Sequence, residues 1–316
     1  MIRSYRIEAH ACRLVEGEAD LETAVWIDLL HPTPDEDRTV EDATGAQIPT
    51  REEMVEIEPS SRLYSDEGVS VMTAPVMVRS TGDYPQMTEV SFVLTRRQLI
   101  TVRYDEPVSF ENFANAVMQA PRICTGPGTV FVSLLDAIVD RIADTLEAAD
   151  RELDALGRDT FTGERQSGEL HKRMQRLGRA GEVVSKARMS LVGLSRVVAH
   201  ARGLDALRRH DTSDNLRLVQ RDVETLIEHA ASLAGKSTFL LDALLGMISI
   251  EQNAIIKTFS VVAVLFLPPT LIASIYGMNF AFMPELDWRI GYPLALLAMI
   301  GSMGGTYAFF KRKGWI

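Results

Sequence analysis

Two long stretches without a charged side chain constrain this chain more than any other feature of its sequence. They span residues 258–284 and 290–310 of a 316-residue chain. A helix needs about 20 apolar residues to cross the hydrocarbon core of a bilayer, and a charge at its centre costs about 2.5–3.5 kcal/mol on insertion. We therefore expect two membrane-spanning helices, at about 256–277 and 290–310, which a short linker joins into a hairpin.

Positive charges border the hairpin on one side. Lys257 precedes the first stretch, and the basic run Lys311-Arg312-Lys313 follows the second. The positive-inside rule therefore places both ends of the hairpin in the cytoplasm and the linker outside. The N-terminal sequence lacks the apolar segment of a cleavable signal peptide. We expect an inner (plasma) membrane protein whose N- and C-termini are both cytoplasmic.

Residues 1–127 predict a cytoplasmic α/β domain. Short runs rich in Val, Ile, Thr and aromatic residues alternate there with turn signals, as is typical of strands. The expected strands are residues 24–30, 69–78, 88–95 and 99–104. Thr33 and Thr50 stand where the N-caps of two short helices are expected.

Residues 128–253 predict a stalk domain of long helices. Between Pro127 and Pro268 the chain contains no proline, and apolar residues recur at three- and four-residue steps. A helix break is expected at Gly157 and "TFTGE" (160–164), and another at "HDTSDN" (210–215). We expect three helices, at about 129–157, 166–208 and from 214 onward.

The third long helix should continue into the first span, because no stop signal precedes Pro268 and Pro269. The expected fold class is thus an α+β/α membrane protein, whose stalk helices lead into a transmembrane hairpin at residues 254–316. The proline pair removes two backbone donors and predicts a kink. The kink is either a plain bend or a place where freed carbonyls face water.

One face of this helix carries mostly small or polar residues. Stepping by three and four from Asp242 gives Gly246, Ser249, Asn253, Ile256, Ser260, Ala263, Leu267, Thr270, Ser274 and Gly277. Such a stripe serves either close helix packing or the lining of a pore. Its full-span length and its polar ends favour pore lining. Ile256 and Leu267 would then form hydrophobic constrictions, and one such helix per chain requires an oligomer.

Composition argues against several function classes. Residues 1–125 carry 22 acidic and 11 basic side chains, whereas nucleic-acid binding needs clustered Lys and Arg. Cys12 and Cys124 lie far apart and the six histidines are scattered, which argues against a disulfide scaffold or a thiolate zinc site. The sequence contains no phosphate loop or nucleophile elbow, so we expect neither an enzyme nor a bound cofactor.

The segment "YGMNF" (276–280) closes the first span, and "MPEL" (283–286) and a basic tail follow it. This combination resembles the CorA family of divalent-cation transporters. The phrases "WIDLLHP" (26–32) and "LITVRYDEP" (99–107) are also similar to the family. The resemblance implies a funnel-shaped homopentamer in which the first spans line the pore and the second spans form an outer ring. It also implies conduction of Mg²⁺, with Co²⁺ or Ni²⁺ as further ions.

The resemblance assigns roles to individual residues. Gly277, Met278 and Asn279 would form the outer mouth and selectivity filter, beside Tyr276 and Glu285 of the outer loop. Asn253 corresponds to a pore asparagine near the cytoplasmic boundary, and Asp242 to an aspartate three turns earlier. The ion would therefore meet Asn279, Asn253 and Asp242.

The regulatory site of the family is altered in this sequence. Leu218 and Arg221 stand where the resemblance leads us to expect carboxylates that sense internal Mg²⁺. Asp214 and Asp222 are the nearest acidic residues and are candidates for a regulatory metal site.

Two other functions remain open. The first is proton-coupled zinc transport of the ZntB branch, although that branch usually has Val where this chain has Met278. The second is a membrane-anchored coiled-coil scaffold without transport, which would leave the Gly-Met-Asn sequence unexplained. Mg²⁺ transport fits the residues better, because Mg²⁺ retains its water and is suited by neutral oxygen ligands such as the amide of Asn279.

Overall fold

The chain forms two compact units in the computed structural model, Met1–Leu241 and Asp242–Ile316. One helix, α7 (His210–Tyr276), contributes residues to both units. The structure describes residues 1–8, 11–17, 21–56, 58–79, 85–120, 124–162, 167–208, 210–279 and 283–314.

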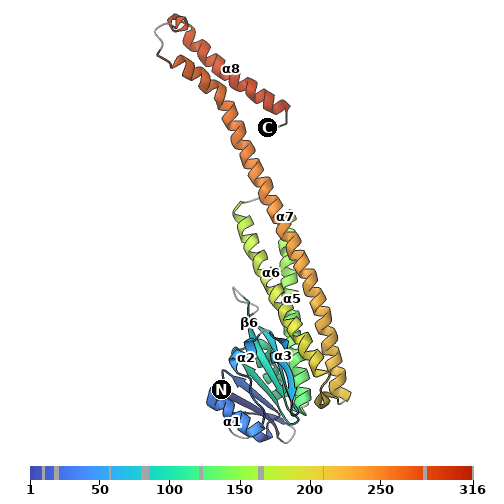
Figure 1. Ribbon diagram of the computed structural model, residues 1–316. Helices are drawn as coiled ribbons and strands as arrows, with labels where there is room; N and C mark the ends of the chain where they lie inside the picture. Colours follow the sequence, from blue (N-terminus) through green and yellow to red (C-terminus); the bar gives the residue numbers. More distant parts are fainter. Residues whose placement is uncertain are drawn as a thin grey trace. The chain divides into compact units, whose positions relative to one another are not determined.

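A mixed seven-stranded sheet lies at one end of the first unit, and the long helices α5 (Pro127–Thr162), α6 (Ser167–Ala201) and α7 extend away from it (Figure 1). Its strands are β1 (Ile2–Glu8), β2 (Ala11–Glu16), β3 (Trp26–Leu30), β4 (Leu63–Asp66), β5 (Val69–Arg79), β6 (Gln86–Leu94) and β7 (Leu99–Arg103). The strand order is β2-β1-β3-β7-β6-β5-β4. Neighbouring strands are antiparallel, except that β3 and β7 pair in parallel. The four strands expected from the sequence are confirmed as β3, β5, β6 and β7.

Short helices cover one face of the sheet. They are η1 (Leu21–Thr23), α1 (Pro34–Thr44), α2 (Arg51–Val55) and α3 (Pro59–Arg62). Thr33 caps α1 and Thr50 caps α2, and each forms a reciprocal capping box with the glutamate three residues later. The predicted N-caps are confirmed. The buried core on this face includes Ile2, Ile27, Leu29, Val40, Met54, Val71, Val93, Ile100 and Val102.

The opposite face of the sheet carries the aromatic core. It lies against α4 (Val108–Gln119), α5 (Pro127–Thr162) and α6 (Ser167–Ala201). Tyr5 stacks on Trp26 at a centroid distance of 4.3 Å, and Phe113 of α4 meets the edge of Trp26 at 5.3 Å. Phe131 of α5 packs against Phe92 of β6. Consecutive strand residues point to opposite faces, so the aromatic side chains gather on one face of the sheet. That face packs against α4 and the stalk helices α5 and α6, which joins the stalk to the sheet.

The long helices differ from the expected boundaries. The first long helix was expected to end at Gly157, but α5 continues to Thr162, which lies within the predicted break at residues 160–164. A Cβ atom at Gly157 would lie 3.6 Å from Cδ2 of Leu240, an ordinary van der Waals distance, so α5 and α7 pack together at this position without requiring glycine. Helix α6 ends at Ala201 and is followed by η3 (Asp205–Leu207), whereas the sequence led us to expect a helix up to residue 208.

Helix α7 runs beside α5 within the first unit (Figure 1), and ionic contacts join the two helices. Nζ of Lys236 lies 2.6 Å from Oδ1 of Asp150 and 2.7 Å from Oδ1 of Asp154. The expected continuation of the last stalk helix into the first span is confirmed, since α7 is helical from His210 to Tyr276 and includes Pro268 and Pro269.

The second unit contains two apolar helices. They are the C-terminal part of α7 and α8 (Gly291–Arg312), with the short helix η4 (Pro284–Asp287) between them. Both helices are long and apolar enough to cross a membrane. Helix α7 ends at Tyr276 and α8 spans Gly291–Arg312, within two residues of the helix ends expected at 277, 290 and 310. The position of this hairpin in a membrane stays a prediction.

Candidate ion pathway

The Gly-Met-Asn sequence forms the turn that ends α7. The N–H of Gly277 donates to the carbonyl of Ala273 at 2.9 Å, and the N–H of Met278 donates to the carbonyl of Ile275 at 3.3 Å. A Cβ atom at Gly277 would lie 3.1 Å from the Ala273 carbonyl oxygen. Any larger residue would press on that carbonyl, so glycine permits the tight exit from the helix. Met278 and Asn279 are both exposed.

The stripe predicted to line a pore is exposed along its whole length in the single chain. The exposed members are Asp242, Gly246, Ser249, Asn253, Ile256, Ser260, Ala263, Leu267, Thr270, Ser274 and Gly277. The exposed fractions of Ile256 and Leu267 are 62% and 67%. Most other residues of α7 between Asn253 and Asn279 are exposed as well, so the pore-lining role of the stripe stays a prediction.

A different face of α7 is partly buried within the second unit. Its members are Val261, Leu265, Pro268, Pro269 and Ile272. At 100° per residue, the centre of this face lies roughly 150° from the centre of the exposed stripe. Helix α8 has its own partly buried face, made of Gly291, Ala295, Met299, Ser302, Met303 and Thr306. The contacts made within the chain thus leave the small, polar stripe uncovered.

The proline pair belongs to the partly buried face. Pro268 and Pro269 cannot donate to the carbonyls of Val264 and Leu265, one turn earlier. Because neither proline lies on the exposed stripe, the pair does not belong to the residues predicted to line the pore.

The outer loop follows Asn279. Tyr276, the last residue of α7, is 41% exposed. Phe280, the last residue of "YGMNF", lies outside the described residues. The backbone of Glu285 belongs to η4, but its side chain lies outside the described part of the structure.

The two candidate regulatory aspartates have different surroundings. Asp214 lies in the first turns of α7, where its Oδ1 is 3.4 Å from Nη1 of Arg217. Asp222 lies two turns further along α7. Its charge is close enough to Asp136 and Asp140 of α5 to raise the pKa of both carboxyl groups. Desolvation by burial raises the pKa of Asp136, and the charges of Asp140 and Asp222 raise it further.

Sequence reasoning missed the aspartates of α5. Asp136, Asp140 and Asp144 follow one another at four-residue steps, which places them on one helix face. That spacing was the available signal, but the proximity of Asp222 depends on how α5 packs against α7. Within the described ranges, no group of three or more His, Cys, Asp or Glu side chains could hold a metal ion.

The structure combines an α/β unit, a last stalk helix that continues into a candidate membrane span, and an apolar hairpin with an amide-bearing turn. These features define a two-span membrane protein of the ion-transporting class. The chain belongs to the family described as CorA-like Mg²⁺ transporter protein, whose sequence profile matches residues 22–312. The family that the sequence resembles is therefore confirmed.

Known proteins resemble the chain over its full length. A magnesium transport protein CorA from Haemophilus influenzae is 32% identical over 100% of both chains. The complete structure of the CorA magnesium transporter from Methanocaldococcus jannaschii has a TM-score of 0.76 at 18% identity, over 100% of this chain and 99% of that one. The ZntB cytoplasmic domain from Vibrio parahaemolyticus has a TM-score of 0.58 at 10% identity, over 78% of this chain and 97% of that one. At these identities the two structures show a shared fold alone.

Proposed function

We propose that this chain is the subunit of a homopentameric channel that conducts Mg²⁺ across the inner (plasma) membrane, with Co²⁺ and Ni²⁺ as further ions. One observation carries the proposal. The small and polar stripe of α7 is exposed throughout and ends at Gly277, Met278 and Asn279. The assembly surrounds a lumen with five such stripes. Membership of the CorA-like family supports Mg²⁺ as the transported ion.

The chemistry of the stripe suits a hydrated ion. Mg²⁺ gives up its water reluctantly and prefers oxygen ligands. A ring of Asn279 side chains offers neutral amide oxygens to the hydration shell, so the ion is recognised without being trapped. Asn253 offers a second amide ring and Asp242 a carboxylate ring. Met278 plays no part as a ligand, because a thioether is a poor partner for Mg²⁺.

Residues at the ends of the second span support the proposed orientation. Trp288 and Tyr292 are 57% and 76% exposed near the start of α8, and such aromatic residues favour the membrane interface. Lys311 and Arg312 lie in the last turn of α8. In the proposed topology the Asn279 turn faces outward and both termini are cytoplasmic.

Regulation by internal Mg²⁺ would need ligands from more than one subunit. Within one chain Asp222 lies near Asp136 and Asp140, while Asp214 pairs with Arg217. We propose Asp214 and Asp222 as contributors to a regulatory metal site only where a neighbouring subunit completes the coordination.

Zinc transport and a scaffold without transport are the alternatives. The fold does not separate magnesium from zinc transport, because the ZntB cytoplasmic domain shares it. Proton-coupled Zn²⁺ uptake would favour the zinc alternative. An oligomer that conducts no ion would favour the scaffold.

Ion uptake into proteoliposomes tests the proposal. Purified protein is reconstituted with a Mg²⁺-sensitive dye inside, and Mg²⁺, Co²⁺, Ni²⁺ and Zn²⁺ are offered in turn, with or without a proton gradient. We expect potential-driven Mg²⁺ entry, which Asn279→Ala reduces by roughly tenfold or more, equivalent to about 1.4 kcal/mol or more in the barrier. Asn215→Ala is the matched control, because Asn215 is an exposed amide on α7 outside the span. Zn²⁺ entry that requires the proton gradient, without Mg²⁺ flux, would overturn the proposal.

Cysteine accessibility tests the face of α7 that lines the lumen. Ser274 lies on the stripe, whereas its neighbour Ile275 is also exposed in one chain but points about 100° away around the helix. In a background without Cys12 and Cys124, an aqueous thiol reagent should modify Ser274→Cys and block uptake. Ile275→Cys should react several-fold more slowly, because it faces lipid or protein. Equal reaction at both positions would contradict the pore assignment.

A further inference from the structure

One face of α6 carries two exposed arginines with apolar side chains between them. Arg188, Val192 and Arg196 are exposed and follow one another at four-residue steps, so they share one side of the helix. Met189, beside them, is 57% exposed. Neither arginine forms an ion pair or a side-chain hydrogen bond with any residue that the structure describes. These four residues, the α6 face, are therefore a cationic surface with an apolar centre and no cover from their own chain.

A surface of opposite charge lies on α5. Asp136, Asp140 and Asp144, the α5 face, are exposed and repeat at the same four-residue step. None of the three forms an ion pair or a side-chain hydrogen bond within the described ranges. Partial burial raises the pKa of Asp140, and the charges of Asp144 and Asp222 raise it further. The carboxylates thus repel one another, and cations from outside the chain would offset that repulsion.

The charges on the two faces have the same spacing. Arg188 and Arg196 are eight residues apart, as are Asp136 and Asp144. At 1.5 Å per residue, the members of each pair are separated by about 12 Å along their helix. Two such helices can therefore bring both arginines next to aspartates at the same time.

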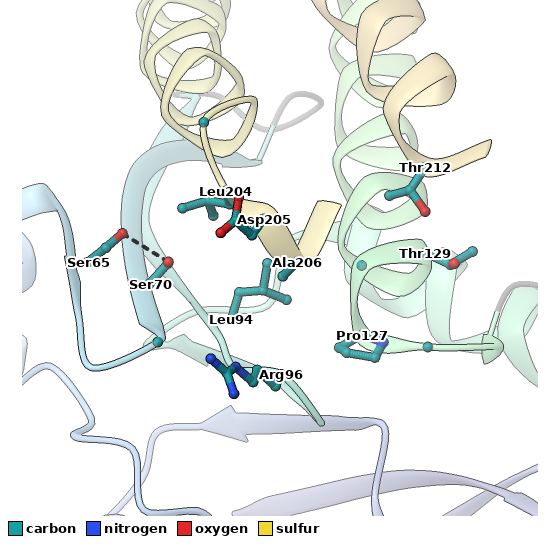
Figure 2. A pocket seen from close by; sticks show the side chains of 14 residues that line it. Ser65, Ser70, Leu94, Arg96, Pro127, Thr129, Leu204, Asp205, Ala206 and Thr212 are labelled. Carbon is teal, nitrogen blue, oxygen red and sulfur yellow. Dashed lines mark hydrogen bonds between the residues drawn. The ribbon is translucent and has the colours of Figure 1, made fainter. Parts of the chain in front are cut away.

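Helices α5 and α6 run antiparallel, and contacts at two places fix their register. Towards one end, Nε of Arg176 in α6 lies 2.7 Å from Oε1 of Glu152 in α5. At the other end, Leu204, which follows α6, lines a cleft together with Pro127 and Thr129 of the first turn of α5 (Figure 2). The end of α6 thus meets the start of α5.

This register places the α6 face level with the α5 face. Arg188 lies twelve residues after Arg176, and Asp140 lies twelve residues before Glu152. The two residues are therefore at about the same height along the helices. They form no ion pair within the described chain, so a partner at this height has to come from another molecule. By the same count, Arg196 lies about one helical turn from the height of Asp136.

A cyclic assembly preserves this equal height between neighbours. Rotation about an axis parallel to the stalk helices carries one subunit onto the next without shifting it along the helices. A contact between two different faces, repeated by that rotation, closes into a ring. The α6 face of one subunit then meets the α5 face of the next at matching height.

We propose that the α6 face docks onto the α5 face of a second copy of this chain. Arg188 then lies against Asp140, and Arg196 lies against Asp136. Complementary charges determine which faces meet, and burial of the apolar centre of the α6 face adds to the affinity. The contact rests on the proposed oligomer and names the surfaces through which its first units meet.

Cross-linking between two kinds of subunit tests the contact. In a background without Cys12 and Cys124, size-tagged subunits with Arg188→Cys are co-expressed with untagged subunits that carry Asp140→Cys. The full-length protein in detergent is treated with a short bis-maleimide reagent, because an arginine–aspartate contact holds its Cα atoms further apart than a disulfide allows. Light scattering measures whether the same sample is an oligomer. In the matched control, Glu111→Cys replaces Asp140→Cys, because Glu111 is also exposed and acidic but lies on α4.

We expect the cross-linked product to be the mixed pair of one tagged and one untagged subunit. It should exceed the tagged–tagged and untagged–untagged pairs by about fivefold or more, because the contact joins two different faces. The Glu111→Cys control should give a mixed pair weaker by a similar factor.

Charge exchange provides a second test. Reporter cysteines are placed by Arg196→Cys on one kind of subunit and by Asp136→Cys on the other. Arg188→Asp or Asp140→Arg alone, in both kinds of subunit, should lower cross-linking by about threefold or more, since like charges then meet. The two changes together should restore it, because the ion pair is rebuilt with its charges reversed.

Three results would overturn the contact in a sample that is an oligomer. They are absence of the mixed pair, an equally strong mixed pair in the Glu111→Cys control, and no recovery in the exchanged variant. Because no transport is measured, these results leave the proposed channel standing. A protein that light scattering shows to be a monomer would instead overturn the contact and the proposed homopentamer together.

Discussion

A buried ion pair joins the parallel strands β3 and β7, and its removal gives a quantitative prediction. Oδ2 of Asp28 lies 2.7 Å from Nη2 of Arg103, and both side chains are 3% exposed or less. Oδ1 of Asp28 accepts from Nε of Arg103 at 3.0 Å and from the hydroxyl of Thr101 at 2.8 Å. Trp26 donates from Nε1 to the same threonine oxygen at 3.0 Å, and the guanidinium lies 4.9 Å from the ring centroid of Phe110.

Asp28→Asn removes the negative charge and leaves the guanidinium of Arg103 buried. Breaking one partner of a buried pair costs about 3–5 kcal/mol. In a unit of this size, each kcal/mol lowers Tm by roughly 2–4 °C, so we expect the Tm to fall by roughly 6–20 °C. The double variant Asp28→Leu with Arg103→Met removes both charges, and it should recover much of the lost stability because apolar replacements of buried pairs are often neutral.

The assay uses Trp26 as a local reporter, because it belongs to this network. With Trp288 and Trp315 replaced by Phe, its fluorescence follows unfolding of the sheet in the full-length protein as the temperature rises. Asp205→Asn serves as the control, because that aspartate pairs with Arg208 on the exposed surface and should cost less than about 1 kcal/mol. A fall in Tm for Asp28→Asn no larger than for the control would refute the reasoning. So would a double variant as unstable as the single one.

Two further changes test helix packing in the first unit. A Cβ atom at Gly193 would lie 2.5 Å from Cδ of Pro75, so Gly193→Ala should lower the free energy of unfolding by about 1–3 kcal/mol. Gly178→Ala in the same helix meets nothing within 4 Å and should raise it by up to about 1 kcal/mol; thermal unfolding that ranks them the other way would contradict this. Burial and neighbouring charges, including Asp222, raise the pKa of Asp136, so the folded chain binds more protons and its stability rises as the pH falls through that pKa. Asp222→Asn should therefore stabilise the protein at pH 7 by about 0.2–0.5 kcal/mol and make no such difference at low pH; a Tm below that of the wild type at pH 7 would contradict the assignment.

Strands and helices with a strong local pattern could be predicted from the sequence, and weakly patterned ones could not. Strands β3 and β7 were predicted because their sequences are mostly apolar. The structure agrees with that pattern, since all five residues of each strand are buried. The hairpin of β1 and β2 was not predicted, because Arg3, Arg6 and Arg13 interrupt its apolar residues. Helix α4 was missed because Pro107, at its N-cap, makes no side-chain capping bond.

The candidate pathway was predictable because it lies within one continuous helix. Its residues share a face by the 3.6-residue period alone. The proximity of Asp222 to Asp136 was not predictable, because α5 and α7 are far apart in the sequence. Pairing between helices depends on their packing, and the periodicity of a single helix does not contain that information.

The polar groups of the exposed stripe argue further for a water-filled lumen over plain helix packing. The hydroxyl of Thr270 is satisfied within the helix, since it donates to the carbonyl of Phe266 at 2.7 Å. Asn253, Ser260 and Ser274 have no hydrogen-bond partner in the part of the chain that the structure describes. An amide or hydroxyl without a partner in hydrocarbon costs several kcal/mol, so these side chains need water or another subunit. In the proposed oligomer, a hydrated lumen would supply these partners along the whole span and would also enclose the Asn279 turn.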